Sequence, residues 1–392
     1  MLKTFREIVP DNLRQEIKRI LLGRPKICPE LYSWARANPS HAEIVKEFWN
    51  PHRKQRNIPV GLMGENPPPL FLDNLEYQIF HKTLFRIKNV RIRGQDGLLF
   101  LPDGSVCQQT SWMYSQITGN PAYLRPWRGP EVFKSGNYST LILFWGLGYY
   151  HWFADVLSML HEAIELLPKD TIFLIKKGFK QSYSGEHYLP TMNALGIPKE
   201  RLLEFDGTES LILENFWWQP PAANTDEQAP GALKWVGQQI SRSVKRTSAE
   251  NPTRIYISRR EPSARVVANE QEFMLDLEGL GFQICWLEGM PFEEQVRLFR
   301  NAEIVVGPHG AGLTNLIFCR ARTQVVEILP EGYEKHFYWG VSTELELDYR
   351  FHLAKAKFPG RRGEPDMEIR TEDFIGALQE LFSKTDMNLR EV

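Results

Sequence analysis

The second half of the chain alternates short apolar runs with amphipathic stretches. The runs are rich in β-branched residues and have strand length, whereas the stretches between them repeat their apolar residues at helical spacing. The pattern predicts a strand starting at 254, a helix over 269–280, a strand over 282–286, a helix over 291–301, and strands over 303–306 and 324–329. Regular alternation of this kind is typical of a mostly parallel sheet covered by helices.

The first half changes its pattern several times. Prolines punctuate residues 1–60, which we expect to be helical, and 84–106 alternates like strands around a turn at 101–105. Later segments predict strands over 139–145, over 171–176 and near Leu202, and helices over 151–167, 190–195, 231–246 and 372–384.

The segment 217–224 breaks this alternation and indicates a linker. We therefore expect three parts: an N-terminal extension with helices and short strands over 1–130, a Rossmann-like domain over 131–230, and a second Rossmann-like domain over 231–392. The fold class is α/β.

A glycine-containing loop joins the strand at 303–306 to a helix. Its residues are Gly307, Pro308, His309, Gly310, Ala311, Gly312 and Leu313. Since the helix is expected to begin near Ala311, its unpaired amides and its dipole would attract an anion such as a phosphate. A bound nucleotide is the first hypothesis. The alternative is that the glycines only let the helix pack closely against the strand.

Basic side chains follow the strand that starts at 254. Ser258, Arg259 and Arg260 stand at its end, and Arg265 comes a few residues later. Ligands of open α/β sheets lie beyond the carboxyl ends of the strands, so this strand end and the glycine loop can border one crevice. The guanidinium fork grips phosphate oxygens in pairs. The alternative is a solvated basic turn beside Glu261.

Four stretches resemble, in order and spacing, glycosyltransferase family 61, often described in bacteria as capsular polysaccharide biosynthesis proteins. They are 149–157, 256–260 with its continuation to Arg265 and 269–270, 307–318, and 325–328. The first 130 residues carry no such match. The resemblance implies a GT-B architecture, in which two Rossmann-like domains face a cleft, with a nucleotide-sugar donor in the C-terminal half. It also implies inverting glycosyl transfer without a bound metal.

Transfer from such a donor needs stabilisation of the leaving diphosphate. The amides from Gly310 to Leu313, together with Arg259, Arg260 and Arg265, are suited to this task, because negative charge develops on the phosphate. The chain contains no D-x-D motif, so we expect no metal and no other cofactor.

Other polar residues near the loop have two interpretations each. Glu327 can accept hydrogen bonds from ribose hydroxyls or be a solvated strand end, and His309 can contact phosphate or sugar or hold the loop through backbone hydrogen bonds. Asn315 lies in the first turns of the helix and is a further donor-binding candidate. Asn269 is expected to cap a helix, with Glu270 favouring the helix start.

The acceptor hydroxyl needs a base, for which His151 and Asp155 are the best pair. They are four residues apart and therefore share a helix face. A histidine takes up a proton near neutral pH, and an aspartate can orient it or act itself, so either can be the base. The alternative is a histidine cap with a surface aspartate. Trp152 and Phe153 are expected in the core.

Composition narrows the partners and the compartment. Lys and Arg total 47 against 48 Asp and Glu, so nucleic acid is not expected. The four cysteines form no C-x-x-C pair and are expected to be reduced thiols. Without a standard signal or a long apolar run, we expect a cytoplasmic protein. The amphipathic stretch 12–22 either lies on a membrane surface or packs on the protein's own core.

The sequence thus predicts a glycosyltransferase that uses a nucleotide-sugar donor and a glycan or lipid-linked glycan acceptor, in surface or capsular polysaccharide assembly. Two alternatives remain: a non-catalytic nucleotide- or glycan-binding protein of the same fold, and a GT-B-like sugar-nucleotide epimerase.

Overall fold

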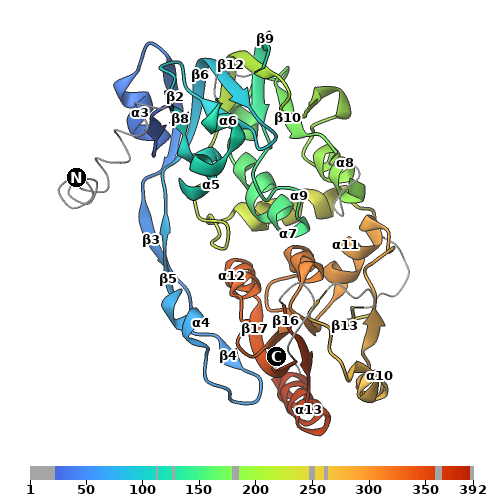
Figure 1. The fold of residues 1–392 in the computed structure, drawn as a ribbon. Helices are drawn as coiled ribbons and strands as arrows, with labels where there is room; N and C mark the ends of the chain where they lie inside the picture. Colours follow the sequence, from blue (N-terminus) through green and yellow to red (C-terminus); the bar gives the residue numbers. More distant parts are fainter. Residues whose placement is uncertain are drawn as a thin grey trace, which may run out of the picture. The chain divides into compact units, whose positions relative to one another are not determined.

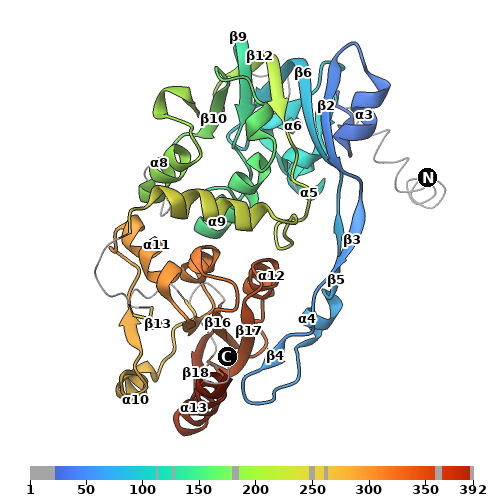
Figure 2. The ribbon, with the colours of Figure 1, turned by 180° about the vertical axis from the view of Figure 1, so that it is seen from behind.

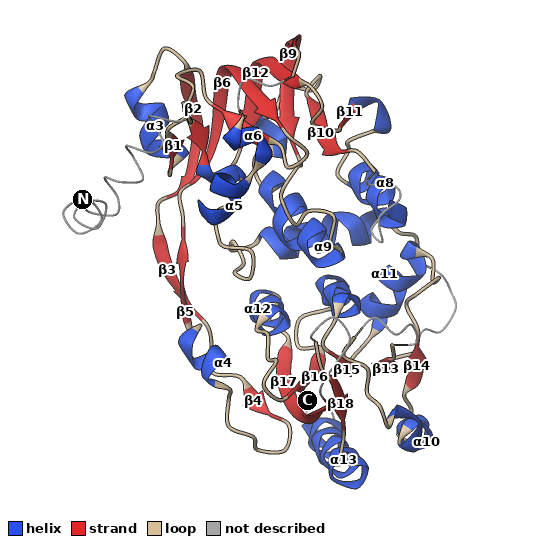
Figure 3. Ribbon diagram, in the orientation of Figure 1, coloured by secondary structure: helices blue, strands red, loops and turns tan. Residues whose placement is uncertain are grey.

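The computed structural model describes residues 23–111, 114–125, 129–178, 185–246, 252–259, 264–357 and 364–388. The amphipathic stretch 12–22 lies outside these residues. Contacts group the chain into two units (Figure 1): the first consists of 1–51 and 80–222, and the second of 52–79 and 223–392. Each unit mixes helices and strands (Figure 3), as the α/β prediction required. The predicted three-part division stays a prediction.

The first unit is built on a large mixed sheet. Its described strands run in the order β1-β8-β7-β6-β12-β9-β10-β11, with β2 paired to β6. Their bounds are β1 Ile27–Cys28, β2 Ala42–Trp49, β6 Lys82–Arg93, β7 Leu98–Phe100, β8 Val106–Cys107, β9 Glu131–Thr140, β10 Ile172–Lys176, β11 Leu202–Phe205 and β12 Ser210–Trp218. From β12 to β11 neighbouring strands are parallel, whereas β6 pairs antiparallel with both β12 and β2.

Residues of the predicted extension therefore complete the sheet of the first unit. In the β6 and β12 pairing, Ile92 lies opposite Leu211 and Ile87 opposite Phe216, and all four side chains are buried. Burial of such pairs fixes the register, because a shift by one residue would turn every apolar side chain to the other face. The helices of this unit are α3 Leu31–Ala37, α5 Tyr114–Gly119, α6 Pro121–Leu124, α7 Tyr149–His151 and α8 Gly185–Ala194.

Three sequence predictions for the first unit are wrong. The helical reading of 1–60 fails at β2, which pairs with β6 and is bent by two register shifts. The strand expected over 139–145 ends at Thr140. The helix expected over 151–167 is a chain of short turns, α7, a π turn over Trp152–Val156 and 3-10 turns over Leu157–Leu160 and Ile164–Leu166. Most of this last segment is buried, so packing on several sides overrides the helical pattern.

The second unit contains the mostly parallel sheet that the sequence predicts. Its order is β14-β13-β15-β16-β17-β18, and β4 pairs with β17. All these pairings are parallel except β17 with β18. The strands are β4 Val60–Gly61, β13 Arg254–Ile257, β14 Gln283–Cys285, β15 Ile304–Pro308, β16 Gln324–Pro330, β17 Asp348–Lys357 and β18 Asp366–Glu368. The helices are α9 Ala232–Ser243, α10 Met274–Gly279, α11 Phe292–Asn301, α12 Phe337–Glu344 and α13 Thr371–Asn388.

An early segment of the chain, 52–79, belongs to this second unit. It contains the antiparallel pair β3 His52–Gln55 and β5 Glu76–Ile79, the strand β4 and the helix α4 Pro69–Asp73, which follow one another along an arm (Figure 2). Through β4 the arm adds an edge strand to the sheet. No helix among the described residues is long and apolar enough to cross a membrane.

A buried lysine stands where β6 begins in the first unit. Lys82 is 1% exposed, and its Nζ lies 2.7 Å from Glu162 Oε2, 3.0 Å from His161 Nδ1 and 4.1 Å from the centre of the Trp49 ring. Burial, followed by the charge of Lys82, lowers the pKa of His161 to about 4, although Glu162 opposes this shift. His161 therefore stays neutral in the folded protein, and its Nδ1 accepts a hydrogen bond from the Lys82 ammonium group.

This arrangement predicts acid-sensitive stability. Because the pKa of His161 is about 4 in the folded chain and about 6.5 in an unfolded one, the unfolded chain binds the proton first as the pH falls. The contribution of His161 is present above pH 6.5 and is lost as the pH approaches 4. We expect His161→Asn, which keeps an acceptor for Lys82, to flatten this part of the unfolding free energy against pH in urea titrations. An unchanged profile would contradict the assignment.

A close helix contact in the second unit gives another prediction. A Cβ on Gly237 of α9 would lie 2.0 Å from the backbone oxygen of Ile317, which cannot move without its helix. Gly237→Ala should therefore lower the free energy of unfolding by about 1–3 kcal/mol or more. In the matched control Gly376→Ala, on α13, the added methyl group meets nothing within 4 Å. This control should be neutral or stabilising by less than about 1 kcal/mol, measured by chemical denaturation.

Candidate functional site

The glycine loop of the second unit follows a fully buried strand. β15 lies between β13 and β16, and the chain leaves it at Pro308. A 3-10 helix over Ala311–Phe318 begins directly after Gly310. The predicted strand, loop and helix start are therefore confirmed, although the helix is of the tighter 3-10 type.

The first turn of this helix offers free amide donors to an incoming anion. The first backbone bond of the helix runs from Leu313 N to Gly310 O, at 3.0 Å. The amides of Ala311 and Gly312 come before this bond and so precede the helix's own hydrogen bonds. Such amides bind phosphate groups in many nucleotide sites.

Arg259 lies directly against Gly310. Its Nη1 donates to the backbone oxygen of His309 at 3.2 Å, and a Cβ on Gly310 would stand only 1.7 Å from the same nitrogen. Gly310 has an extended backbone, with φ 171° and ψ 170°, so the absence of a side chain matters here for space and not for backbone strain. The end of β13 and the glycine loop thus meet at one place, as the sequence predicted.

The buried carboxylate of Glu327 holds the glycine loop through a hydrogen bond with His309. Glu327 on β16 is 0% exposed, and its Oε1 lies 2.5 Å from His309 Nδ1. Its Oε2 accepts a hydrogen bond of 2.6 Å from the Tyr349 hydroxyl on β17. The solvated strand end considered for Glu327 is therefore wrong, and both carboxylate oxygens are engaged. A ribose contact of Glu327 stays a prediction.

The carboxylate fixes how His309 presents its ring. With Nδ1 committed to Glu327, the nitrogen left for another partner is Nε2, and a protonated ring would offer an N–H donor there. Burial, followed by the charge and hydrogen bond of Glu327, raises the pKa of Tyr349 well above its usual value, so this hydroxyl remains a donor. His309 thus holds its place through its side chain as well as its backbone amide, which donates to Ile328 O at 2.9 Å.

Ser258 belongs to an internal network. Its hydroxyl donates to Glu270 Oε2 at 2.6 Å and accepts from Trp286 Nε1 at 3.0 Å, while the Tyr256 hydroxyl donates to Glu270 Oε1 at 2.8 Å. Burial raises the pKa of Glu270 although the Ser258 and Tyr256 hydrogen bonds lower it. The network anchors the end of β13, so Ser258 positions Arg259 in the chain, and its own donor contact stays a prediction.

Of the other two arginines of the predicted set, one pairs with an acidic side chain and one lies outside the described residues. Arg265 Nη1 lies 3.1 Å from Glu364 Oε2, and its guanidinium carbon lies 6.0 Å from the centre of the Tyr333 ring. Arg260 lies outside the described residues. Donor contacts of both stay predictions.

Two asparagines have internal partners. Asn315 is 1% exposed, and its Nδ2 donates to Gln295 Oε1 at 3.0 Å and to Gly312 O at 3.2 Å, which ties the 3-10 helix to α11. Asn269 stands at the N-cap position of a 3-10 helix over Glu270–Glu272, as expected, but its side chain makes no cap hydrogen bond and instead exchanges hydrogen bonds with the backbone of Ile369. A donor contact of Asn315 stays a prediction.

The predicted base pair lies in the first unit. His151 Nδ1 lies 2.7 Å from Asp155 Oδ2, and the side chains are 21% and 4% exposed. The cap with a surface aspartate is therefore wrong. The pair spans the π turn over Trp152–Val156, a local geometry that is frequent at functional sites. Asp155 orients the ring through Nδ1, which assigns Nε2 of His151 as the nitrogen that can take a proton. Trp152 and Phe153 are buried, as expected.

The sequence pattern did not predict two side chains of these sites, Trp145 beside His151 and Tyr349 beside Glu327. Trp145 is 48% exposed and stacks beside His151, with ring centres 6.1 Å apart; the flanking Gly146 and Gly148 were the available signal. Tyr349 lies on β17, whose alternation of Tyr349, Phe351 and Leu353 had the period of a strand.

His, Cys, Asp and Glu side chains are the usual ligands of a protein-bound metal ion. Within the described ranges, no three or more of them are arranged to hold a metal ion. Metal independence itself stays a prediction.

Comparison with known proteins points to one family. The family described as glycosyltransferase 61 matches residues 149–326. An EGF domain-specific O-linked N-acetylglucosamine transferase of Drosophila melanogaster is 42% identical over 66 residues, which cover 16% of this chain and 12% of the relative. A beta-1,2-xylosyltransferase of Oryza sativa subsp. japonica is 37% identical over 60 residues, 15% and 11% of the two chains.

A beta-1,2-xylosyltransferase of Arabidopsis thaliana is 29% identical over 72 residues, 18% of this chain and 14% of the relative. The matches thus span a small part of the curated relatives' length. The matched family segment begins with the His151 helix turn and ends in β16, so it contains both the paired histidine and the glycine loop. Residues 149–326 are thus similar to the glycosyltransferase 61 family, and the three relatives are named as glycosyltransferases.

Proposed function

We propose that the protein is an inverting, metal-independent glycosyltransferase that moves a sugar from a nucleotide-sugar donor to a glycan acceptor. The observation that carries this proposal is the contact of Arg259 with Gly310, which precedes the first amides of the 3-10 helix and follows His309, the partner of Glu327. A guanidinium, free amides and an oriented imidazole converge there, which is the chemistry that a diphosphate leaving group requires.

The reaction balances with the groups named. The acceptor hydroxyl oxygen attacks the anomeric carbon as the bond from that carbon to the diphosphate oxygen breaks, and the bonding electrons leave with the diphosphate. Arg259 and the amides of Ala311 and Gly312 stabilise the charge that develops on it. The hydroxyl proton passes to His151 Nε2, while Asp155 stabilises the positive ring that forms. Trp145 offers an exposed aromatic face beside the His151 ring, on which a sugar can stack.

The finer parts of the proposal rest on the family resemblance. They are a GT-B arrangement of the two units and a role in surface or capsular polysaccharide assembly on a glycan or lipid-linked glycan. A cytoplasmic location and peripheral membrane association are proposed from the sequence pattern instead. The names of the relatives mention N-acetylglucosamine and xylose transfer, which supports a sugar donor without fixing the sugar of this chain.

The donor site predicts a specific equivalence between two variants. An alanine methyl group at position 310 would occupy the place of Arg259 Nη1, the movable end of a long side chain. Gly310→Ala should therefore leave the fold intact and weaken nucleoside diphosphate binding about as much as Arg259→Ala, by roughly 10- to 100-fold. The double variant should be no worse than either single one, because both remove the same contact.

The measurement is a thermal-shift panel of nucleoside diphosphates and nucleotide sugars with a chelator present, followed by titration calorimetry. Arg297→Ala is the matched control, since it removes a charge that pairs with Glu293 on α11. If Arg259→Ala lost nucleoside diphosphate binding while Gly310→Ala bound normally, the proposed contact between Arg259 and Gly310 would be contradicted. No shift with any nucleotide would overturn the donor assignment, and a shift that requires added metal would overturn metal independence.

The base assignment predicts a split between binding and turnover. His151→Gln should lower the transfer rate by about 10²- to 10⁴-fold and leave the donor shift unchanged, because it removes proton transfer only. Asp155→Asn should lower kcat less and should leave donor binding unchanged. His41→Gln, an exposed histidine of the same unit, serves as control.

Product assays against glycan acceptors make this measurement. A His151→Gln protein with the wild-type rate would mean that another group takes the proton. Donor binding without product in the wild type would favour the non-catalytic alternative, and conversion of the donor without any acceptor would favour the epimerase.

A further inference from the structure

A pocket lies within the first unit, at the opposite end of the sheet from His151. It has a volume of about 710 Å³ and is bordered by the end of β6, by the turn that follows it, by α6 and by the turn before β12. β9 and β12 begin next to it, whereas His151 comes after the carboxyl end of β9. The pocket is therefore separate from the candidate base.

Glycines shape this pocket by letting backbones touch. A Cβ on Gly207, where φ is +75°, would lie 2.3 Å from the Gly94 carbonyl carbon, and a Cβ on Gly94, where φ is +73°, would lie 2.8 Å from the Ala122 Cβ. Both positions require glycine for conformation as well as for space. The turn after β6, the turn before β12 and the helix α6, which carry Gly94, Gly207 and Ala122, together form one wall of the pocket.

Arg93 is the group in this pocket that needs an explanation. It is 5% exposed, and within the described ranges its side chain forms no hydrogen bond or ion pair. Burial, followed by the nearby Arg91, lowers the pKa of Arg93, although the charge of Glu131 opposes this shift. Glu131 itself pairs with Arg91 at 2.9 Å. A buried charge without a direct partner costs several kcal/mol, so such a charge indicates a counter-ion supplied from outside the chain.

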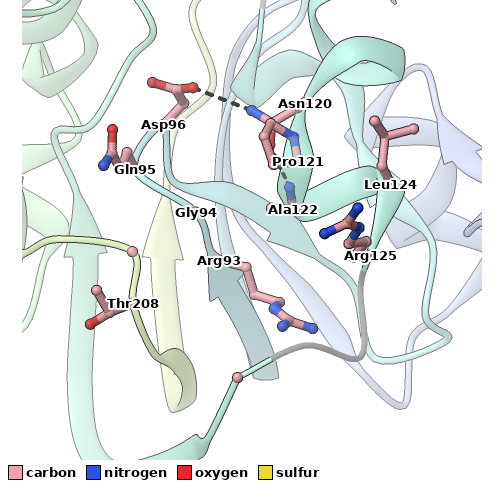
Figure 4. Close-up of a pocket in the computed structure, with 12 residues that line it drawn as sticks. Arg93, Gly94, Gln95, Asp96, Asn120, Pro121, Ala122, Leu124, Arg125 and Thr208 are labelled. Carbon is pink, nitrogen blue, oxygen red and sulfur yellow. Dashed lines mark hydrogen bonds between the residues drawn. The ribbon is translucent and has the colours of Figure 1, made fainter.

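The negative charge of Asp96, which lines the pocket, already has partners within the chain. Asp96 Oδ1 lies 2.9 Å from Lys176 Nζ, and its Oδ2 accepts from Asn120 Nδ2 at 3.2 Å. Arg125, at the end of α6, adds a second guanidinium at the exposed rim. Figure 4 shows Arg93 and Arg125 on one side of the pocket and Asp96 on the other. The uncompensated charge of the pocket is therefore positive.

We propose that this pocket binds the oxyanion group, carboxylate or phosphate, of a small hydroxylated molecule, with Arg93 as its anchor. Arg125 contacts the same group from the rim, since two guanidiniums can share the oxygens of one anion. The exposed side chains of Gln95 and Thr208 also line the pocket and hydrogen-bond hydroxyl groups of the ligand (Figure 4). Binding here needs neither the nucleotide donor nor transfer, so it is independent of the proposed function.

The test is titration calorimetry of the full chain at low ionic strength with glucose 6-phosphate, glucuronate, inorganic phosphate and glucose. We expect the anionic sugars to bind and glucose not to bind; comparison of glucose 6-phosphate with glucuronate identifies the head group. Arg93→Met and Arg125→Ala should each weaken binding by at least about 10-fold. Arg93→Met should also keep or raise the unfolding temperature without ligand, because it removes an unpaired buried charge.

Two controls separate this pocket from other sites. Lys88→Gln removes an equal charge at an exposed position of the same strand, outside the pocket, and should bind like the wild type. Arg259→Ala should lose nucleoside diphosphates and keep the sugar anion. If Arg93→Met does not fold, Arg125→Ala on the exposed rim decides. The proposal is overturned if no anion binds the wild type, or if Arg125→Ala and Arg93→Met bind as tightly as it does.

Discussion

The carboxylate of Glu327 is the constraint around which the donor half is arranged. It is fully buried, and an unpaired carboxylate in that position would cost several kcal/mol. His309 from the loop after β15 and Tyr349 from β17 each donate to one of its oxygens, so three neighbouring elements are joined at one charge. The loop can therefore present its first amides and the second nitrogen of His309 in a fixed geometry without a ligand to organise it.

Close packing, in addition to these hydrogen bonds, fixes the position of Arg259 beside the glycine loop. Arg259 occupies the space beside Gly310 that any side chain would fill, and the hydrogen-bond network of Ser258, Glu270 and Trp286 holds the strand end from which Arg259 projects. A surface arginine would spend much of its time in water. Here the guanidinium is confined next to the amides with which it would share a phosphate.

Four buried charged groups of this protein follow the same physical rule with different outcomes. Glu327 and Asp155 are buried carboxylates that each orient a histidine, and Lys82 is a buried cation satisfied by Glu162 and His161. Arg93 is equally buried, but the described residues offer it no direct counter-ion. The contrast between Lys82 and Arg93 separates a cation that stabilises the fold from one that stands ready for a ligand.

Features that depend on local pattern could be predicted from the amino-acid sequence. Apolar runs of strand length, the Gly-Pro-His-Gly turn and the basic end of β13 gave the parallel sheet of the second unit and the meeting of Arg259 with the glycine loop. The four-residue spacing gave the His151 and Asp155 contact. These features need only neighbours in the chain or the common direction of parallel strands.

Tertiary structure decided what depends on distant partners. β2, read as helical, is a strand because β6 offers it a register, and the segment after His151 is not a regular helix because it is buried on several sides. The arm of 52–79 joins the second unit through β4. The burial of Glu327, Ser258, Asn315 and Arg93 follows from contacts with side chains far along the chain. Such contacts leave no local pattern, since burial is a property of the assembled core and not of a residue's neighbours in sequence.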